Sequence, residues 1–236
     1  MKTLAIKTLS SENFVVILAL LIAIVLFAAG VGKTQQLQPG ISVQLATTTG
    51  AASVPEADNQ DAWIVTVSEN NNIYFGVDPV TPQSLLNAMK TRPRNRGQEL
   101  YIKADGRTAF ATVTQVLKVA HADMFDRVIL LTQQPSGAQP GTIVPPKGLP
   151  IWVGSAATPE AVVVQIDPGQ ESPTLKIDNQ EVPLKTLHHH LEQLLRGRND
   201  RVVVLKAGWV SFADVAHVVD VCNMSGAKTV LAAPTL

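Results

Sequence analysis

The sequence predicts an α+β protein with one N-terminal transmembrane helix followed by two tandem two-layer α/β modules. Three observations predict this class. Residues 14–32 are uniformly apolar, two later segments share one order of short strands and one-sided apolar helices, and Pro, Gly, Gln and Thr separate them. The boundaries that follow are a cytoplasmic N-terminus (1–13), a span (14–32), a linker (33–60), a first module (61–132), a second linker (133–159) and a second module (160–236).

Bulk composition supports a globular protein outside that span. Apolar residues make up 46% of the chain, enough for a sizeable core, and the formal net charge is zero. A zero charge gives no reason to expect nucleic acid as a partner. The single cysteine, Cys222, excludes a scaffold built on internal disulfides, and its place in an apolar helical pattern predicts burial.

The N-terminal apolar run has the length of a membrane helix. From Phe14 to Gly32 it reads FVVILALLIAIVLFAAGVG, without an ionisable side chain. At 1.5 Å rise per residue such a helix is about 28 Å long, close to the hydrocarbon thickness of a bilayer. The alternative is a cleaved signal peptide with Ala28-Ala29-Gly30 as its cleavage site, but the run is longer than a usual signal core. We therefore favour an uncleaved anchor.

The charges around this span predict its orientation. Lys2, Lys7 and the amino terminus precede it, and only Lys33 follows closely. The positive-inside rule then places the N-terminus in the cytoplasm and the rest of the chain on the other side of the membrane.

Each module begins with a predicted β-hairpin and a helix. In the first, residues 63–67 and 73–75 flank Glu69-Asn70-Asn71-Asn72, where Asn tolerates the positive φ of a turn. Thr81 and Pro82 then form a helix start. In the second, residues 162–166 and 175–177 precede a helix whose expected apolar face is Leu184, Leu187, Leu191 and Leu194.

The second halves of the modules match more closely. Residues 100–117 (LYIKADGRTAFATVTQVL) and 203–219 (VVLKAGWVSFADVAHVV) each give an apolar strand, Lys-Ala, a short turn, a Phe and an amphipathic helix. A short strand closes each, at 128–131 and 229–232. Each module thus reads hairpin, helix, strand, helix, strand, with two helices on one face of a small sheet. Chance similarity is the alternative, but the shared Lys-Ala, Phe and element order favour a duplication.

Residues 100–132, with YIKADGRTAFATVTQVLKVAH and the closing RVILLT, resemble the ExbD/TolR family of biopolymer-transport proteins. The second copy resembles it more weakly, because Gly208 stands where Asp105 stands in the first. The resemblance implies a homodimer in the bacterial inner membrane with its modules in the periplasm. It also implies an ExbB/TolQ-like channel as partner, and peptidoglycan or an outer-membrane protein as a further one. The rival hypothesis is a passive periplasmic scaffold or cell-wall-binding module without proton coupling.

One family feature is missing. The resemblance implies a proton-responsive Asp early in the span, yet residues 14–32 contain no Asp, and the matching register falls near Asn13 with Glu12 beside it. An amide cannot exchange a proton near neutral pH, and Glu12 sits at the aqueous edge. The alternative for both residues is an N-terminal helix cap.

Two groups of charged residues are further candidates for ligand or partner contact. Arg92, Arg94 and Arg96 form a basic cluster, which reads either as a solvated loop or as a contact for anionic cell-wall polymer or lipid headgroups. Asp105 and Arg107 follow a predicted strand; they suggest either a ligand contact or turn chemistry in which Asp105 caps and Gly106 supplies positive φ.

No motif predicts catalysis, a cofactor or a metal. His188, His189 and His190 are adjacent on a predicted helix and therefore point about 100° apart, which does not converge on one ion. The sequence contains no nucleophile elbow, Walker loop or dinucleotide fingerprint. We therefore expect a protein that is not an enzyme.

Overall fold

The computed structural model describes residues 40–133, 145–154, 160–170 and 172–232, which lie in one compact unit, Leu37–Leu236. The span predicted at 14–32 lies outside the described residues, as do Glu12 and Asn13. In the described ranges no helix combines the length and apolarity needed to cross a bilayer.

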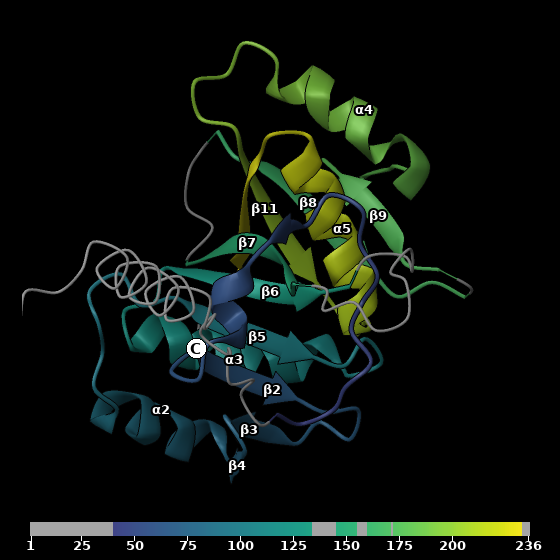
Figure 1. The fold of residues 1–236 in the computed structure, drawn as a ribbon. Coiled ribbons are helices and arrows are strands. Elements are labelled where there is room, and N and C mark those ends of the chain that lie inside the picture. The colour runs from purple at the N-terminus through teal and green to yellow at the C-terminus, as the bar shows by residue number, and fades with distance from the viewer. Residues whose placement is uncertain (1–39, 134–144, 155–159, 171, 233–236) are drawn as a thin grey trace, which may run out of the picture. The chain divides into compact units, whose positions relative to one another are not determined.

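The described strands form one mixed sheet of twelve strands (Figure 1). Its first half runs β4 (Asp78–Val80), β3 (Ile73–Phe75), β2 (Trp63–Val67), β5 (Leu100–Ala104) and β6 (Arg127–Thr132). The second half runs β10 (Gln180–Glu181), β9 (Thr174–Ile177), β8 (Val162–Asp167), β11 (Val202–Ala207) and β12 (Lys228–Ala232). Strand β7 (Lys147–Gly154) joins the halves: it pairs antiparallel with β6 and parallel with β12. The halves therefore share a single sheet.

Two helices belong to each half, α2 (Pro82–Thr91) and α3 (Phe110–Ala122) in the first and α4 (Leu184–Leu195) and α5 (Phe212–Met224) in the second. Both halves follow the order of three strands, helix, strand, helix, strand. The predicted hairpins, helices and closing strands are confirmed, with β4 and β10 as additional short strands. That the halves arose by duplication stays a prediction.

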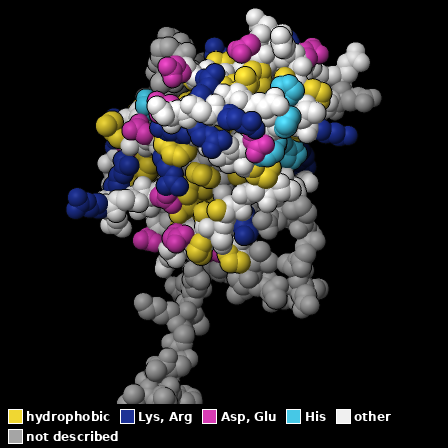
Figure 2. Space-filling model, turned by 90° about the horizontal axis from the view of Figure 1, so that it is seen from above, with side chains coloured by type: hydrophobic (Ala, Val, Ile, Leu, Met, Phe, Trp, Pro, Cys, Tyr) yellow, Lys and Arg dark blue, Asp and Glu magenta, His cyan; other side chains and the backbone are white. Residues whose placement is uncertain are grey.

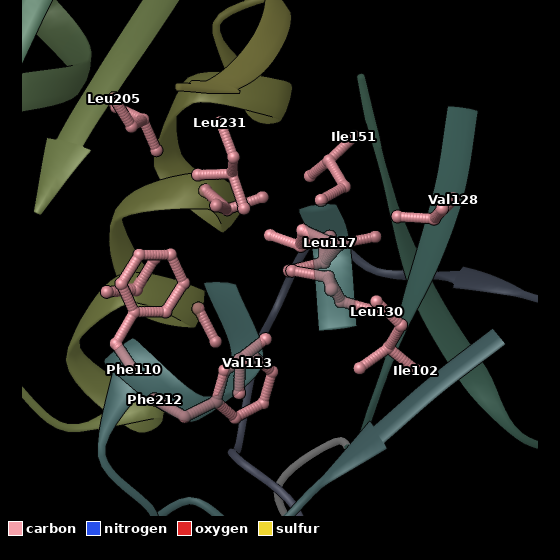
Figure 3. Packing of buried hydrophobic residues seen from close by; sticks show 14 of the residues in the cluster. Ile102, Phe110, Val113, Leu117, Val128, Leu130, Ile151, Leu205, Phe212 and Leu231 are labelled. Atoms are coloured by element: carbon pink, nitrogen blue, oxygen red, sulfur yellow. The ribbon is translucent and has the colours of Figure 1, made fainter. Parts of the chain in front are cut away.

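The main core lies between these helices and one face of the sheet. It is built from alternate strand residues and from the apolar helix faces, as Figure 3 shows for Val113 and Leu117 of α3 against Ile102 and Leu130. Leu187, Leu191 and Leu195 are the buried leucines of α4, whereas Leu184 is 39% exposed. The predicted face of α4 was therefore wrong at Leu184. Cys222 is buried in this core, and burial raises the pKa of its thiol to about 12.

The predicted linker at 133–159 was wrong in part, because residues 147–154 form β7. The prolines of this segment, including Pro150, are unusual inside a sheet and therefore suggested a linker. On the side of β7 away from β6, β1 (Ala52–Ser53) pairs with Lys147 and Gly148, and β12 pairs with residues 152–154. Pro150 falls between these two partners, so its missing N–H leaves no ladder position empty. Its carbonyl accepts a hydrogen bond from the Asn223 side chain at 3.0 Å.

The predicted linker at 33–60 was also wrong over residues 40–58, which we call the strap. The strap contains β1 and the 3-10 helix η1 (Pro55–Asp58), which Figure 1 shows. Its residues Ala46 and Ala51 belong to the main core beside α5, whereas Leu45, Val54 and Ala57 pack on the opposite face of the sheet. On that opposite face a second, smaller apolar cluster forms from Leu45, Val54, Ala57, Ala62, Ile64, Tyr101, Ile129 and Leu131. Residues far along the chain stabilise the strap, which its polar composition does not reveal.

Candidate functional site

Asp105 is the centre of a polar cluster at the C-terminal end of β5. Its side chain is 3% exposed, and it accepts four hydrogen bonds: from the N–H of Gln44 at 2.9 Å, and from the backbone N, Nε and Nη2 of Arg107 at 3.0, 2.9 and 3.0 Å. The Arg107 guanidinium, helped by the N–H groups of Gln44 and Arg107, lowers the pKa of Asp105 to about 2. The structure thus brings together the two residues that the sequence suggested at this turn.

Arg107 also pairs with Glu69 of the β2–β3 turn, Nη2 to Oε2 at 2.9 Å, and its side chain is 53% exposed. An anionic ligand at Arg107 would therefore compete with two carboxylates. The expected positive φ at Gly106 was wrong. Gly106 instead allows close packing: its N–H donates to the Gln44 carbonyl at 2.8 Å, and a Cβ there would lie 3.3 Å from that of Ala213. The turn holds the strap and α5 together.

The β2–β3 hairpin turn, next to this cluster, contacts the start of helix α3. Asn71 has φ of 61°, as the sequence predicted, and Ala109 at the N-cap offers no side-chain acceptor. The Asn71 side-chain oxygen accepts from the hydroxyls of Thr108 and Thr112, at 2.7 and 3.0 Å, and from the Ala109 N–H at 3.2 Å. A residue 38 positions away therefore ties the hairpin turn to the first turn of α3.

A second buried carboxylate, Asp220 of α5, holds the other part of the strap. It is 5% exposed and accepts from the Thr49 N–H at 2.8 Å, the Thr49 hydroxyl at 3.1 Å and the Gly50 N–H at 3.0 Å. The sequence analysis missed this residue. The available signal was a single Asp within the apolar run Val218–Cys222, because a charge on a buried helix face needs partners.

The basic cluster lies at the opposite end of β5, before Leu100. The guanidinium of Arg92 stacks 5.4 Å from the Trp63 ring centroid and 5.2 Å from that of Phe75, and that of Arg94 lies 3.7 Å from Phe125. Arg92 also donates to the carbonyl of Asp61 at 3.1 Å, and Arg94 to that of Asp123 at 2.9 Å. Arg96 is exposed. Two of the three arginines therefore cover aromatic rings at the edge of the core. A role of the cluster in ligand contact stays a prediction.

The three histidines lie on an exposed part of α4, and Figure 2 shows histidine side chains together with basic and acidic ones on the face seen from above. His188 Nδ1 lies 2.8 Å from the Ser225 hydroxyl, His189 Nε2 lies 2.8 Å from Gln193 Nε2, and His190 Nδ1 lies 3.4 Å from the Thr186 carbonyl. His188 Nε2 also lies 3.5 Å from Glu192 Oε1, so the three rings share no partner.

Sequence reasoning also missed a cavity of about 230 Å³ between the strap and the sheet. Its lining includes Lys103 of β5, Thr66 of β2 and Asp58 of η1. Burial lowers the pKa of Lys103 and raises that of Asp58, and each charge partly offsets the shift of the other. The signal in the sequence was a lysine inside the otherwise apolar strand LYIKA.

Comparison with known proteins links the first half of this chain to one family. Residues 13–135 match the family model described as biopolymer transport protein ExbD/TolR. The biopolymer transport protein ExbD of Mannheimia haemolytica is 26% identical over 129 residues, which cover 55% of this chain and 83% of that relative. No solved structure gives a significant match. The match thus runs from the start of the predicted span to just beyond β6, and the second half lies outside it.

Proposed function

The chain belongs to the ExbD/TolR family of biopolymer transport proteins, and from this premise we propose that it is a membrane-anchored accessory subunit of a complex driven by the proton-motive force. The observation that carries the proposal is the extent of the family match, which begins at residue 13 and covers anchor, strap and first module together. In this proposal the N-terminus is cytoplasmic, residues 14–32 span the bacterial inner membrane and the modules are periplasmic.

The proposed partner is a channel of the ExbB/TolQ type, which carries the proton path. The span predicted at 14–32 contains no titratable side chain, so Glu12 at its N-terminal edge is the nearest carboxylate of this chain that could take part. Asn13 cannot exchange a proton. We propose a transmitting role for this chain, as a homodimer, toward peptidoglycan or an outer-membrane protein.

A passive periplasmic scaffold or cell-wall-binding module is the second candidate function. The absence of Asp from residues 14–32 favours it, because a subunit without proton coupling needs no ionisable group there. Arg92, Arg94, Arg96, Asp105 and Arg107 are the candidate contacts for an anionic polymer or a protein partner. Of these, Arg96 has no aromatic or carboxylate partner among the described residues and is the first to test.

Affinity purification of the full-length chain from native membranes in mild detergent tests the two functions. The subunit proposal expects a multi-spanning channel protein in stoichiometric amount, and a chain whose residues 14–32 are replaced by an unrelated span should lose it. Recovery of cell-wall fragments without a channel would instead support the scaffold. Replacing Glu12 with Gln then tests its part in coupling, and unchanged transport in cells would exclude Glu12 from the proton path.

A further inference from the structure

The cavity under the strap has an apolar wall and a small set of polar groups. Leu45, Ala57, Ile64 and Leu131 line it on the apolar side, and they belong to the smaller apolar cluster. Its volume of about 230 Å³ lies below the ~300–1,000 Å³ of pockets that hold drug-sized ligands. The space therefore suits a smaller amphipathic molecule.

Thr66 is a buried polar residue in the lining of this cavity. The residue is 1% exposed, and it lies on the strand face that carries Ile64, opposite Trp63, Val65 and Val67 in the main core. No described residue forms a hydrogen bond with its side chain. Buried hydroxyl groups almost always have a partner, because an unmade bond costs about 1–3 kcal/mol. A polar atom of an occupant would give this hydroxyl such a partner.

Lys103 and Asp58 add two opposite charges at the same cavity. The Lys103 ammonium donates to the Ile41 carbonyl of the strap at 2.9 Å, which leaves further N–H donors for another acceptor. The Asp58 carboxylate forms no hydrogen bond within the described part of the chain, and the two charges do not form a direct ion pair there. Two half-buried, opposite charges separated by an open space match a molecule that carries both charges itself.

We propose that this cavity binds a free α-amino acid with an aliphatic side chain, such as leucine or valine. Lys103 and the Thr66 hydroxyl would hold its carboxylate, Asp58 would hold its ammonium, and the apolar wall would cover its side chain. A peptide does not fit this description, because its two charged groups are separated by more than one residue. The inference is independent of the transport function proposed above, so either can fail without the other.

Isothermal titration calorimetry of the full-length chain in detergent micelles with L-leucine tests this site. We expect saturable 1:1 binding that Lys103→Met and Asp58→Asn each weaken at least about tenfold, the usual loss for one charge-assisted contact. The matched control is Lys206→Met. Lys206 stands at the equivalent place in β11, is exposed and does not line the cavity, so this variant should bind leucine as the unmodified chain does.

Ligand analogues test the same idea without altering the fold. Isocaproate lacks the ammonium of leucine and isoamylamine lacks its carboxylate, so each should bind the unmodified chain at least about tenfold more weakly than leucine. Absence of saturable heat with both leucine and valine would show that the cavity holds only water. Equal affinities for leucine and isocaproate, or equal binding by the Lys103→Met and Lys206→Met variants, would also overturn the proposal.

Discussion

Two buried carboxylates fix the backbone of the strap. Asp105 accepts the Gln44 N–H, and Asp220 accepts two N–H groups and one hydroxyl from Thr49 and Gly50. Backbone N–H groups in a partly buried segment need acceptors, and a hydrogen bond to a charged group stabilises the fold by about 1.5–3 kcal/mol. These two side chains therefore add to the apolar packing of Leu45, Val54 and Ala57.

The pH dependence of stability tests the role of Asp105. Its pKa is about 2 in the folded protein against about 3.9 for an unperturbed aspartate, so its ionised form stabilises the fold by about 2–3 kcal/mol above pH 4. This contribution should disappear as the pH falls from about 4 to about 2. We expect Asp105→Asn to lower the free energy of unfolding by about that amount at pH 7, and the two proteins to converge toward pH 2.

Urea unfolding of residues 37–236 at a series of pH values measures this difference. The control is Asp126→Asn, because that side chain is 74% exposed and should give a nearly unchanged free energy of unfolding at every pH. A constant gap between Asp105→Asn and the unmodified protein from pH 7 to pH 2 would contradict the assigned role.

At the scale of elements, β7 decides how the two halves join. It has β6 on one side and both β1 and β12 on the other. Gly148 lies where β1, β6 and β7 meet, and a Cβ there would lie 2.4 Å from the Ile129 side chain and 3.2 Å from that of Val54. A β-branched side chain on a neighbouring strand cannot move aside freely, so the contact requires glycine.

Gly148→Ala should therefore destabilise the protein by about 1–3 kcal/mol, the usual cost of overpacking a filled core. The same strand offers a matched control, because a Cβ at Gly154 would meet nothing within 4 Å. Gly154→Ala should change the free energy of unfolding by less than about 0.5 kcal/mol. Urea denaturation of both variants measures the difference, and equal stabilities would show that β7 does not pack as described.

The elements that the sequence predicted are those with a local pattern. Helix α3 repeats apolar residues on one face, and the hairpin around Asn71 has its turn residues in place. Pro150 and the polar strap suggested linkers, because their partners lie far away in the sequence: Gln44 is 61 positions from Asp105, and Thr49 is 171 positions from Asp220. No local pattern carries such contacts. The cavity was missed for the same reason, since Asp58 and Lys103 line one cavity only after the strap has packed on the sheet.

At the scale of the whole described unit, each half covers a sheet edge of the other through β7. Strands β6 and β12 both border β7, and the turns before α3 and α5 also pair: the Phe110 N–H donates to the Val210 carbonyl at 3.0 Å, and the Phe212 N–H donates to that of Thr108 at 2.9 Å. Both phenylalanines then enter the shared core (Figure 3). The two halves of one chain thereby pair with each other, whereas an isolated module would need a second copy for the same contacts.

We therefore expect residues 37–236 to be monomeric in solution. The edges left in the described sheet are β4, with three residues including Pro79, and β1 and β10, with two exposed residues each. Short edges that contain proline or charge pair poorly with other strands. Light scattering after size exclusion should give the mass of one chain at every concentration tested. The full-length chain in detergent, measured in the same way, shows whether the proposed homodimer depends on residues 1–36. A dimer of residues 37–236 that dissociates when β10 is altered would instead place the homodimer contact at a sheet edge.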